Sequence, residues 1–129
     1  MEKIRLLYVE DVPFIQMASK LTIDKFAMIE LETVDTGEEA LCRIKNKKYD
    51  FILMDLGLPK LQGIEVTEKI RNESNNKTAP EVPIFALTAY NGEEIKNKCM
   101  SVGMNGFLEK PLIKKNIEDI LKKYFNIAF

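Results

Sequence analysis

The chain has 129 residues, of which 46% are hydrophobic and 30% are charged, a size and composition typical of one globular domain with one buried core. Its 19 lysines and arginines nearly balance 20 aspartates and glutamates, so no overall field would attract nucleic acid or an anionic membrane surface. No apolar stretch approaches the roughly 18 residues that cross a bilayer, and the charged start is unlike a signal peptide. We therefore expect a cytoplasmic protein whose residues 1–129 form a single domain.

Five short apolar runs predict the strands of a sheet. Residues 4–9 form an apolar run with β-branched ends, which is too short for a helix and typical of a strand covered on both faces. The run at 29–34 alternates apolar and charged residues, as expected near the edge of a sheet. The remaining strands are predicted at 51–54, 84–87 and 107–108.

Helical segments separate these runs. The first begins at a proline, which is favoured in the first turn of a helix, and we expect its Phe14, Ala18 and Leu21 to face the sheet. Asp35 or Thr36 caps the second helix. The later helices are predicted at 63–71, 93–100 and 114–124. Strands and helices that alternate at this spacing predict parallel pairing through right-handed crossovers, and hence a doubly wound α/β sheet.

Charged residues follow the predicted strands at the points where they end. Glu10 and Asp11 follow the first strand, Asp55 the third, and Lys110 the fifth. Because open α/β sheets place their sites at the carboxyl ends of the strands, we expect these side chains to share one pocket. Two carboxylates about 4 Å apart repel by roughly 4 kcal/mol at an effective dielectric of about 20, and one lysine cannot neutralise three acids.

A divalent cation would resolve this repulsion. The sequence contains no histidine and no CxxC motif, which excludes a zinc site and a histidine-based nucleophile relay. An all-oxygen site favours Mg²⁺ (or Mn²⁺), which usually also binds phosphate oxygens. Lys110 and Thr88 would then bind phosphoryl oxygens, and Asp55, alone at the tip of the middle strand, would be the nucleophile.

Each of these residues also has an ordinary structural interpretation. The acidic pair could cap the helix that follows it, Asp55 could be a turn residue, and Phe107 could be part of the core. To replace a functional site, these separate interpretations would all have to be true of residues that lie at the same end of one sheet. A shared functional site explains their common position better.

Five segments, in this order, are similar to one known family: LLYVED (6–11), VDTGEEAL (34–41), FILMDLGLPKLQG (51–63), VPIFALTAY (82–90) and GMNGFLEKP (103–111). Together they resemble the receiver domain of two-component response regulators, most closely the receivers of hybrid sensor histidine kinases. The resemblance covers essentially the whole chain. It implies a flavodoxin-like, doubly wound, five-stranded parallel sheet with strand order 2-1-3-4-5 and five helices.

The resemblance also implies a role for each residue of the pocket. Asp55 would accept a phosphoryl group from a phosphohistidine on a histidine kinase or a histidine phosphotransfer protein. Asp11 and Asp55 would bind Mg²⁺ directly, Glu10 through water, and Gly57 through its backbone carbonyl. Thr88 and Lys110 would hold the phosphoryl oxygens.

Further residues would connect the site to a signalling surface. Pro111 would follow a cis peptide bond. Phe107 would turn inward when Thr88 moves toward the phosphoryl group, which would change the surface of the fourth helix, fifth strand and fifth helix. Gly57 and Tyr90 stand where the family controls attack by water, and glycine cannot orient a water, so we expect slow dephosphorylation.

A phosphoacceptor by itself is not a turnover enzyme, and three other classes of protein are alternatives to it. A flavodoxin-type carrier is disfavoured because the acidic pair would repel the FMN phosphate. An aspartyl-phosphate hydrolase would need a second acid where Gly57 stands. A degenerate receiver that binds partners without phosphorylation is the main alternative. A second copy of the chain is a further candidate partner, with contacts near Ile95, Met104 and Ile113.

Overall fold

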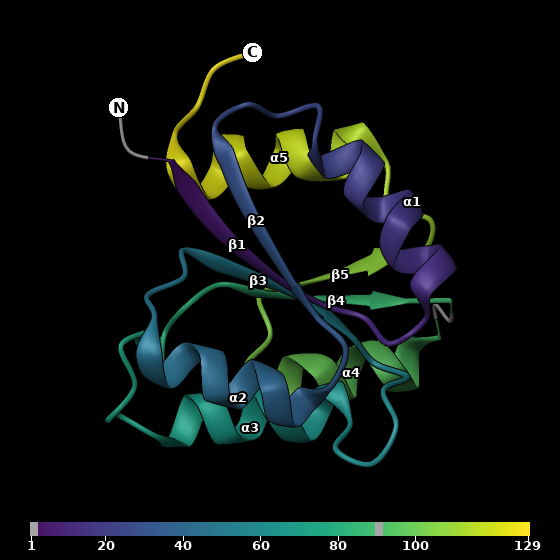
Figure 1. Ribbon diagram of the computed structural model, residues 1–129. Helices are drawn as coiled ribbons and strands as arrows, with labels where there is room; N and C mark the ends of the chain where they lie inside the picture. The colour runs from purple at the N-terminus through teal and green to yellow at the C-terminus, as the bar shows by residue number, and fades with distance from the viewer. Residues whose placement is uncertain (1–2, 90–91) are drawn as a thin grey trace.

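The computed structural model describes residues 3–89 and 92–129. Strands and helices alternate along the chain, as predicted (Figure 1). In chain order they are β1 (Ile4–Val9), α1 (Pro13–Ile23), β2 (Ile29–Val34), α2 (Gly37–Asn46), β3 (Phe51–Asp55), α3 (Gly63–Asn72), β4 (Ile84–Thr88), α4 (Glu93–Ser101), β5 (Gly106–Glu109) and α5 (Lys114–Phe125).

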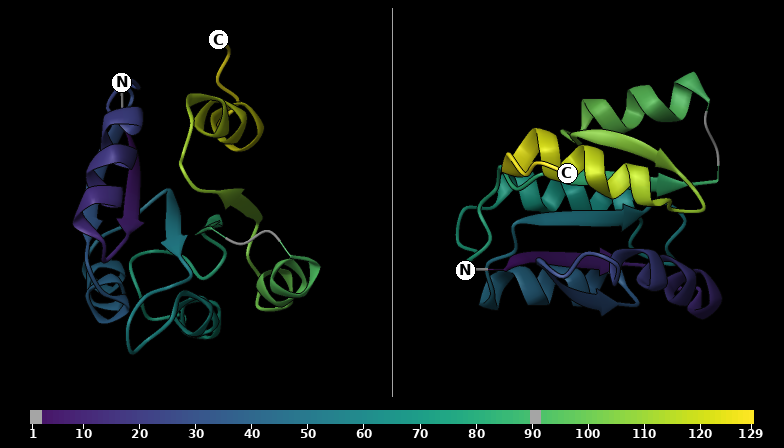
Figure 2. Two further views of the ribbon diagram at one scale, coloured as in Figure 1. Left: turned by 90° about the vertical axis from the view of Figure 1, so that its right-hand side faces the viewer. Right: turned by 90° about the horizontal axis from the view of Figure 1, so that it is seen from above.

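The sheet has five parallel strands in the order β2-β1-β3-β4-β5, which confirms the predicted fold class. Helices α1 and α5 cover one face, and α2, α3 and α4 cover the other (Figure 1). Figure 2 shows the same layers from two further directions. None of the helices within the described ranges is both long and apolar enough to cross a membrane.

The core consists of two apolar clusters, one on each face of the sheet. Leu7 and Val9 of β1 belong to the cluster under α2, α3 and α4, whereas Leu6 and Tyr8 belong to the cluster under α1 and α5. Successive side chains of a strand point to opposite faces, so a strand in the middle of the sheet must be apolar throughout. Charged side chains of these strands therefore lie near their ends, as Arg5 does at the start of β1.

The orientation of α1 differs from the prediction. Phe14 and Leu21, which we expected to face the sheet, are 81% and 65% exposed, whereas Ser19 and Ile23 are buried. The hydroxyl of Ser19 lies against the buried hydroxyl of Tyr8. A buried polar group requires a partner, so this contact favours a serine against the sheet and turns an apolar side of α1 to solvent.

Other local predictions are confirmed, with one exception. Pro13 begins α1, and the Thr36 hydroxyl caps α2 by accepting a hydrogen bond from the Glu39 N–H at 3.1 Å. Met104, however, is only 3% exposed and lies in the core, so it cannot serve as a surface contact of a dimer.

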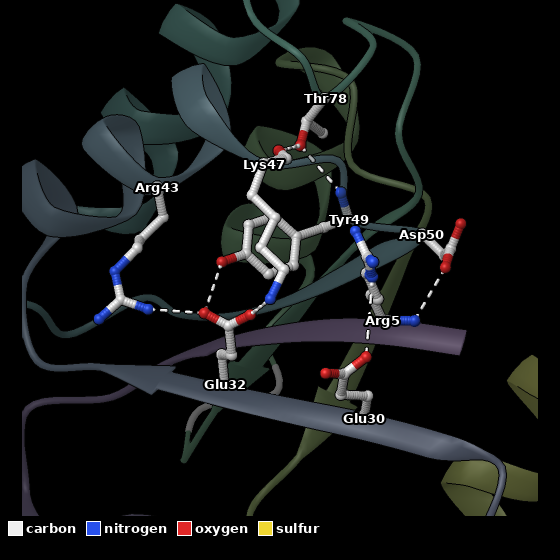
Figure 3. Close-up of polar contacts among 8 residues, drawn as sticks. All are labelled: Arg5, Glu30, Glu32, Arg43, Lys47, Tyr49, Asp50 and Thr78. Carbon is white, nitrogen blue, oxygen red and sulfur yellow. Dashed lines mark hydrogen bonds and ion pairs between the residues drawn. The ribbon is translucent and has the colours of Figure 1, made fainter. Parts of the chain in front are cut away.

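A polar network stabilises the edge strand β2 (Figure 3). Glu32 accepts hydrogen bonds from Arg43 at 2.7 Å, from the Tyr49 hydroxyl at 2.9 Å, and from Lys47. Thr78 donates to the Lys47 carbonyl and accepts from the Tyr49 N–H, which attaches the loop after α3 to this network. Tyr49 precedes β3 and therefore lies at the opposite end of that strand from Asp55.

Candidate functional site

The structure brings the predicted site residues together at the carboxyl edge of the sheet. Asp55 and Thr88 are the last residues of β3 and β4, the acidic pair follows β1, and Lys110 follows β5. Asp11, Asp55, Thr88 and Lys110 line a cavity of about 650 Å³, whereas Glu10 is buried and is not among its described lining residues. Its described lining also includes residues of α4 and of the loops at this edge: Val12, Leu56, Gly57, Ala89, Gly92, Glu94, Ile95 and Lys98.

The three carboxylates form one cluster. One oxygen from each of Glu10, Asp11 and Asp55 lies within 4.8 Å of the others. Glu10 and Asp55 are buried, and Oδ1 of Asp11 is a buried oxygen that has no hydrogen-bond partner within the described residues. Buried polar atoms are almost always paired, so this oxygen indicates a ligand that the protein itself does not supply. The all-oxygen donor set fits a hard divalent cation.

Lys110 lies between two of these acids. Its Nζ is 2.9 Å from Oδ1 of Asp55 and 3.0 Å from Oε1 of Glu10. Burial acts to lower the pKa of Lys110, but the hydrogen bonds to both carboxylates outweigh it and raise the pKa. The lysine therefore stays protonated at neutral pH. The backbone N–H of Lys110 donates to the Thr88 carbonyl at 2.9 Å. The peptide bond from Lys110 to Pro111 is cis, as predicted.

Glu10 is held by more than its charge. Its Oε1 accepts from the Tyr8 hydroxyl and its Oε2 from the Val12 N–H, each at 3.3 Å. Burial raises the pKa of Glu10, the neighbouring Asp55 raises it further, and Lys110 opposes this shift. Burial also raises the pKa of Tyr8, so its hydroxyl remains protonated and can donate.

Tyr8 is the site residue that the sequence analysis missed. It lies inside an apolar run that predicts a buried strand, and its ring does pack in the core. The available signal was its hydroxyl together with the spacing of two residues from Glu10, because side chains two apart on a strand share a face.

Of the remaining predicted residues, some lie at the cavity and others do not. The N–H of Gly57 donates to Oδ1 of Asp55 at 3.1 Å, and Thr88 is a buried residue of the cavity wall. Phe107 lies on β5 beside Ala86 of β4 and is not among the cavity-lining residues. The Nζ of Lys96 on α4 lies 5.6 Å from the centre of the Phe107 ring. Tyr90 lies outside the described residues.

A parallel sheet of this order, with an acid cluster and a lysine at its carboxyl edge, defines the receiver class of signalling proteins. The family model for the response regulator receiver domain matches residues 6–122, and the chain belongs to this family.

Individual relatives agree with this membership. The chain is 39% identical over 136 residues to hybrid signal transduction histidine kinase B of Dictyostelium discoideum, an alignment that covers 97% of this chain and 7% of the relative. The alignments span between 6% and 15% of the length of the first curated relatives.

Solved structures show the same fold. The receiver domain of a Pseudomonas aeruginosa sensor histidine kinase, with a magnesium ion coordinated in its active site cleft, superposes with a TM-score of 0.83 at 31% identity. That comparison covers 97% of this chain and 99% of the other. The chemotaxis response regulator CheY4 of Vibrio cholerae gives a TM-score of 0.80 at 29% identity, covering 95% of this chain and 98% of the other.

Proposed function

We propose that Asp55 accepts a phosphoryl group from a phosphohistidine while Mg²⁺ is bound by the acid cluster. The observation that carries this proposal is the contact of Lys110 with both Asp55 and Glu10, next to the unpaired oxygen of Asp11. An acceptor, a cation for phosphoryl oxygens and an unsatisfied metal ligand thus share one cavity. The cofactor proposal also draws on the magnesium described for the related Pseudomonas receiver domain.

The chemistry would begin from the fixed orientation of Asp55. Its Oδ1 accepts from Lys110 and from the Gly57 N–H, which holds the carboxylate so that its other oxygen can attack phosphorus. The new P–O bond forms as the P–N bond of the phosphohistidine breaks, and the imidazole leaves with the electron pair. Lys110 and Thr88 would bind the transferred oxygens.

The metal ligands would be Asp11, Asp55 and the Gly57 carbonyl, with Glu10 acting through water. When bound, Mg²⁺ would neutralise charge on the transferring phosphoryl group. The chain itself would act as a phosphoacceptor and not as a turnover enzyme.

The phosphodonor would be a histidine kinase or a histidine phosphotransfer protein, as expected for receivers of hybrid kinases. We propose that it contacts the exposed apolar side of α1. Phe14, Met17 and Leu21 are 81%, 64% and 65% exposed, and Val12, just before the helix, lines the cavity. An apolar surface that begins at the mouth of the site would position a partner's histidine over Asp55.

Phosphorylation would be read out through Thr88 and Phe107. Phe107 is half-buried and pairs with Ala86 of β4, and we expect this small neighbour to allow the ring to move inward. Movement of Thr88 toward the phosphoryl group would open this path and change the surface formed by α4, β5 and α5.

The direct test is incubation of the purified protein with Mg²⁺ and acetyl phosphate, followed by intact mass measurement. We expect the gain of one phosphoryl group, its loss in Asp55→Asn, and its retention in Asp24→Asn, which alters an exposed ion pair on α1. No mass gain in the wild type, even with a phosphohistidine donor, would favour a phosphorylation-independent binding module.

A further inference from the structure

Tyr8 places a hydroxyl group beneath the acid cluster. The residue has no exposed surface, and its ring packs in the cluster under α1 and α5. Its hydroxyl donates to Oε1 of Glu10 at 3.3 Å and also lies against the hydroxyl of Ser19 on α1. A phenylalanine would fill the same core space, so the hydroxyl needs an explanation other than packing.

The other contacts of Glu10 show what the hydroxyl can contribute. Oε1 is shared between Tyr8 and Lys110, and Oε2 accepts only from the Val12 N–H among the hydrogen bonds of the described residues. In the proposed reaction Lys110 would turn to a phosphoryl oxygen. Tyr8 would then be the side chain that still holds Glu10 in place.

We infer that Tyr8 is a positioning residue of the metal site, which fixes the Glu10 carboxylate toward the carboxylates of Asp11 and Asp55. This inference rests on the proposed function, because it requires that the cluster binds a divalent cation. Hydrogen bonds to metal-binding groups generally orient them, and their loss weakens metal binding without removing a ligand.

The test is the Mg²⁺ affinity of Tyr8→Phe, which keeps the ring and removes the hydroxyl. Mg²⁺ would be titrated into the folded, unphosphorylated protein and followed by amide chemical shifts. We expect binding weaker by about three- to tenfold, at or below the lower end of the roughly 10- to 100-fold range for such partners, because Glu10 would act through water.

Tyr49→Phe provides a matched control. Tyr49 is also a buried tyrosine whose hydroxyl donates to a glutamate, Glu32 (Figure 3). It precedes β3 and is not among the described residues that line the cavity. We expect both variants to unfold at lower urea concentrations and only Tyr8→Phe to bind Mg²⁺ more weakly. An equal loss of affinity in both variants, or none in Tyr8→Phe, would overturn the inference.

A double mutant tests whether Tyr8 acts through Glu10. In a Glu10→Ala background, Tyr8→Phe should cause no further loss of Mg²⁺ affinity. A full additional loss would mean that Tyr8 acts by another route and would overturn the inference. If the wild type binds no Mg²⁺, the proposed function is overturned as well. If the wild type binds Mg²⁺ and becomes phosphorylated, and Tyr8→Phe is indistinguishable from it, only the role of Tyr8 is overturned.

Discussion

Glu10 destabilises the metal-free protein at neutral pH. Burial raises its pKa, so folding disfavours the charged form of Glu10 relative to the unfolded chain. The contribution of such a group to stability is complete below its unfolded pKa and is lost as the pH rises through the folded pKa. The charged form at neutral pH therefore destabilises the metal-free protein.

We predict that Glu10→Gln raises the free energy of unfolding by about 1 kcal/mol at neutral pH with EDTA present. This gain in the free energy of unfolding should shrink as the pH falls toward the usual pKa of a glutamate, because Glu10 then becomes neutral in the wild type as well. Urea unfolding across this pH range measures the gain. Glu32→Gln is the control of opposite sign, because hydrogen bonds from Lys47 and Tyr49 outweigh burial and lower the pKa of Glu32. A Glu10→Gln protein less stable than the wild type would contradict the prediction.

Gly57 controls the space beside the phosphoacceptor. Among the described residues, a Cβ atom at this position would have one neighbour within 4 Å, Oδ1 of Asp55 at 3.9 Å, so a side chain fits without displacing them. We predict that phospho-Asp55 decays slowly in the wild type and about tenfold faster in Gly57→Asn. An amide can orient the attacking water but cannot take its proton, so the effect should be smaller than that of a catalytic base.

Decay of the intact phosphorylated mass measures this lifetime. Gly92→Asn introduces the same side chain on the cavity rim, where a Cβ meets no atom of the described residues within 4 Å, and should leave the decay unchanged. A wild-type lifetime of seconds would count against the proposed role of Gly57.

At the level of elements, the sequence predicted the strands and the edge of the sheet where their carboxyl ends meet. It did not predict which side of α1 faces the sheet. Apolar residues lie on more than one side of this helix, so periodicity alone could not select the inward face. The side of α1 that carries Ser19 faces the sheet, where Ser19 contacts the hydroxyl of Tyr8. This contact joins two elements and forms only on folding. By contrast, Asp55 and Lys110 follow directly from parallel pairing, which brings strand ends together whatever the loops do.

The exposed side of α1 gives an element-level prediction. Met17→Glu should slow phosphoryl transfer from a phosphorylated histidine phosphotransfer protein by about tenfold, equivalent to about 1.4 kcal/mol, because a charge would be buried in an apolar contact. Labelling by acetyl phosphate should not change. Met100→Glu on α4, where the methionine is 55% exposed against 64% for Met17, should leave both reactions unchanged. Equal slowing by the two variants would argue against a donor surface on α1.

At the scale of the whole molecule, the acid cluster is a product of the fold. Asp11 and Asp55 come from distant parts of the chain and meet only because β1 and β3 are adjacent in the sheet. The unfolded chain separates them and cannot bind the cation in the same way. The proposed metal binding would therefore be linked to folding, since a ligand that binds only the native state stabilises it.

We predict that Mg²⁺ raises the free energy of unfolding by about 2.7 kcal/mol at a free concentration one hundred times its Kd. EDTA should reverse the effect, and acidification should abolish it because protonated carboxylates do not bind the cation. Thermal unfolding with and without Mg²⁺ measures the shift. In Asp11→Asn the shift should be strongly reduced, whereas in Asp119→Asn, which removes an exposed charge from α5, it should persist. Equal shifts in these two variants would mean that Mg²⁺ acts through general ionic effects, because the proposed binding at the carboxyl edge of the sheet uses the oxygen of Asp11 that has no hydrogen-bond partner among the described residues.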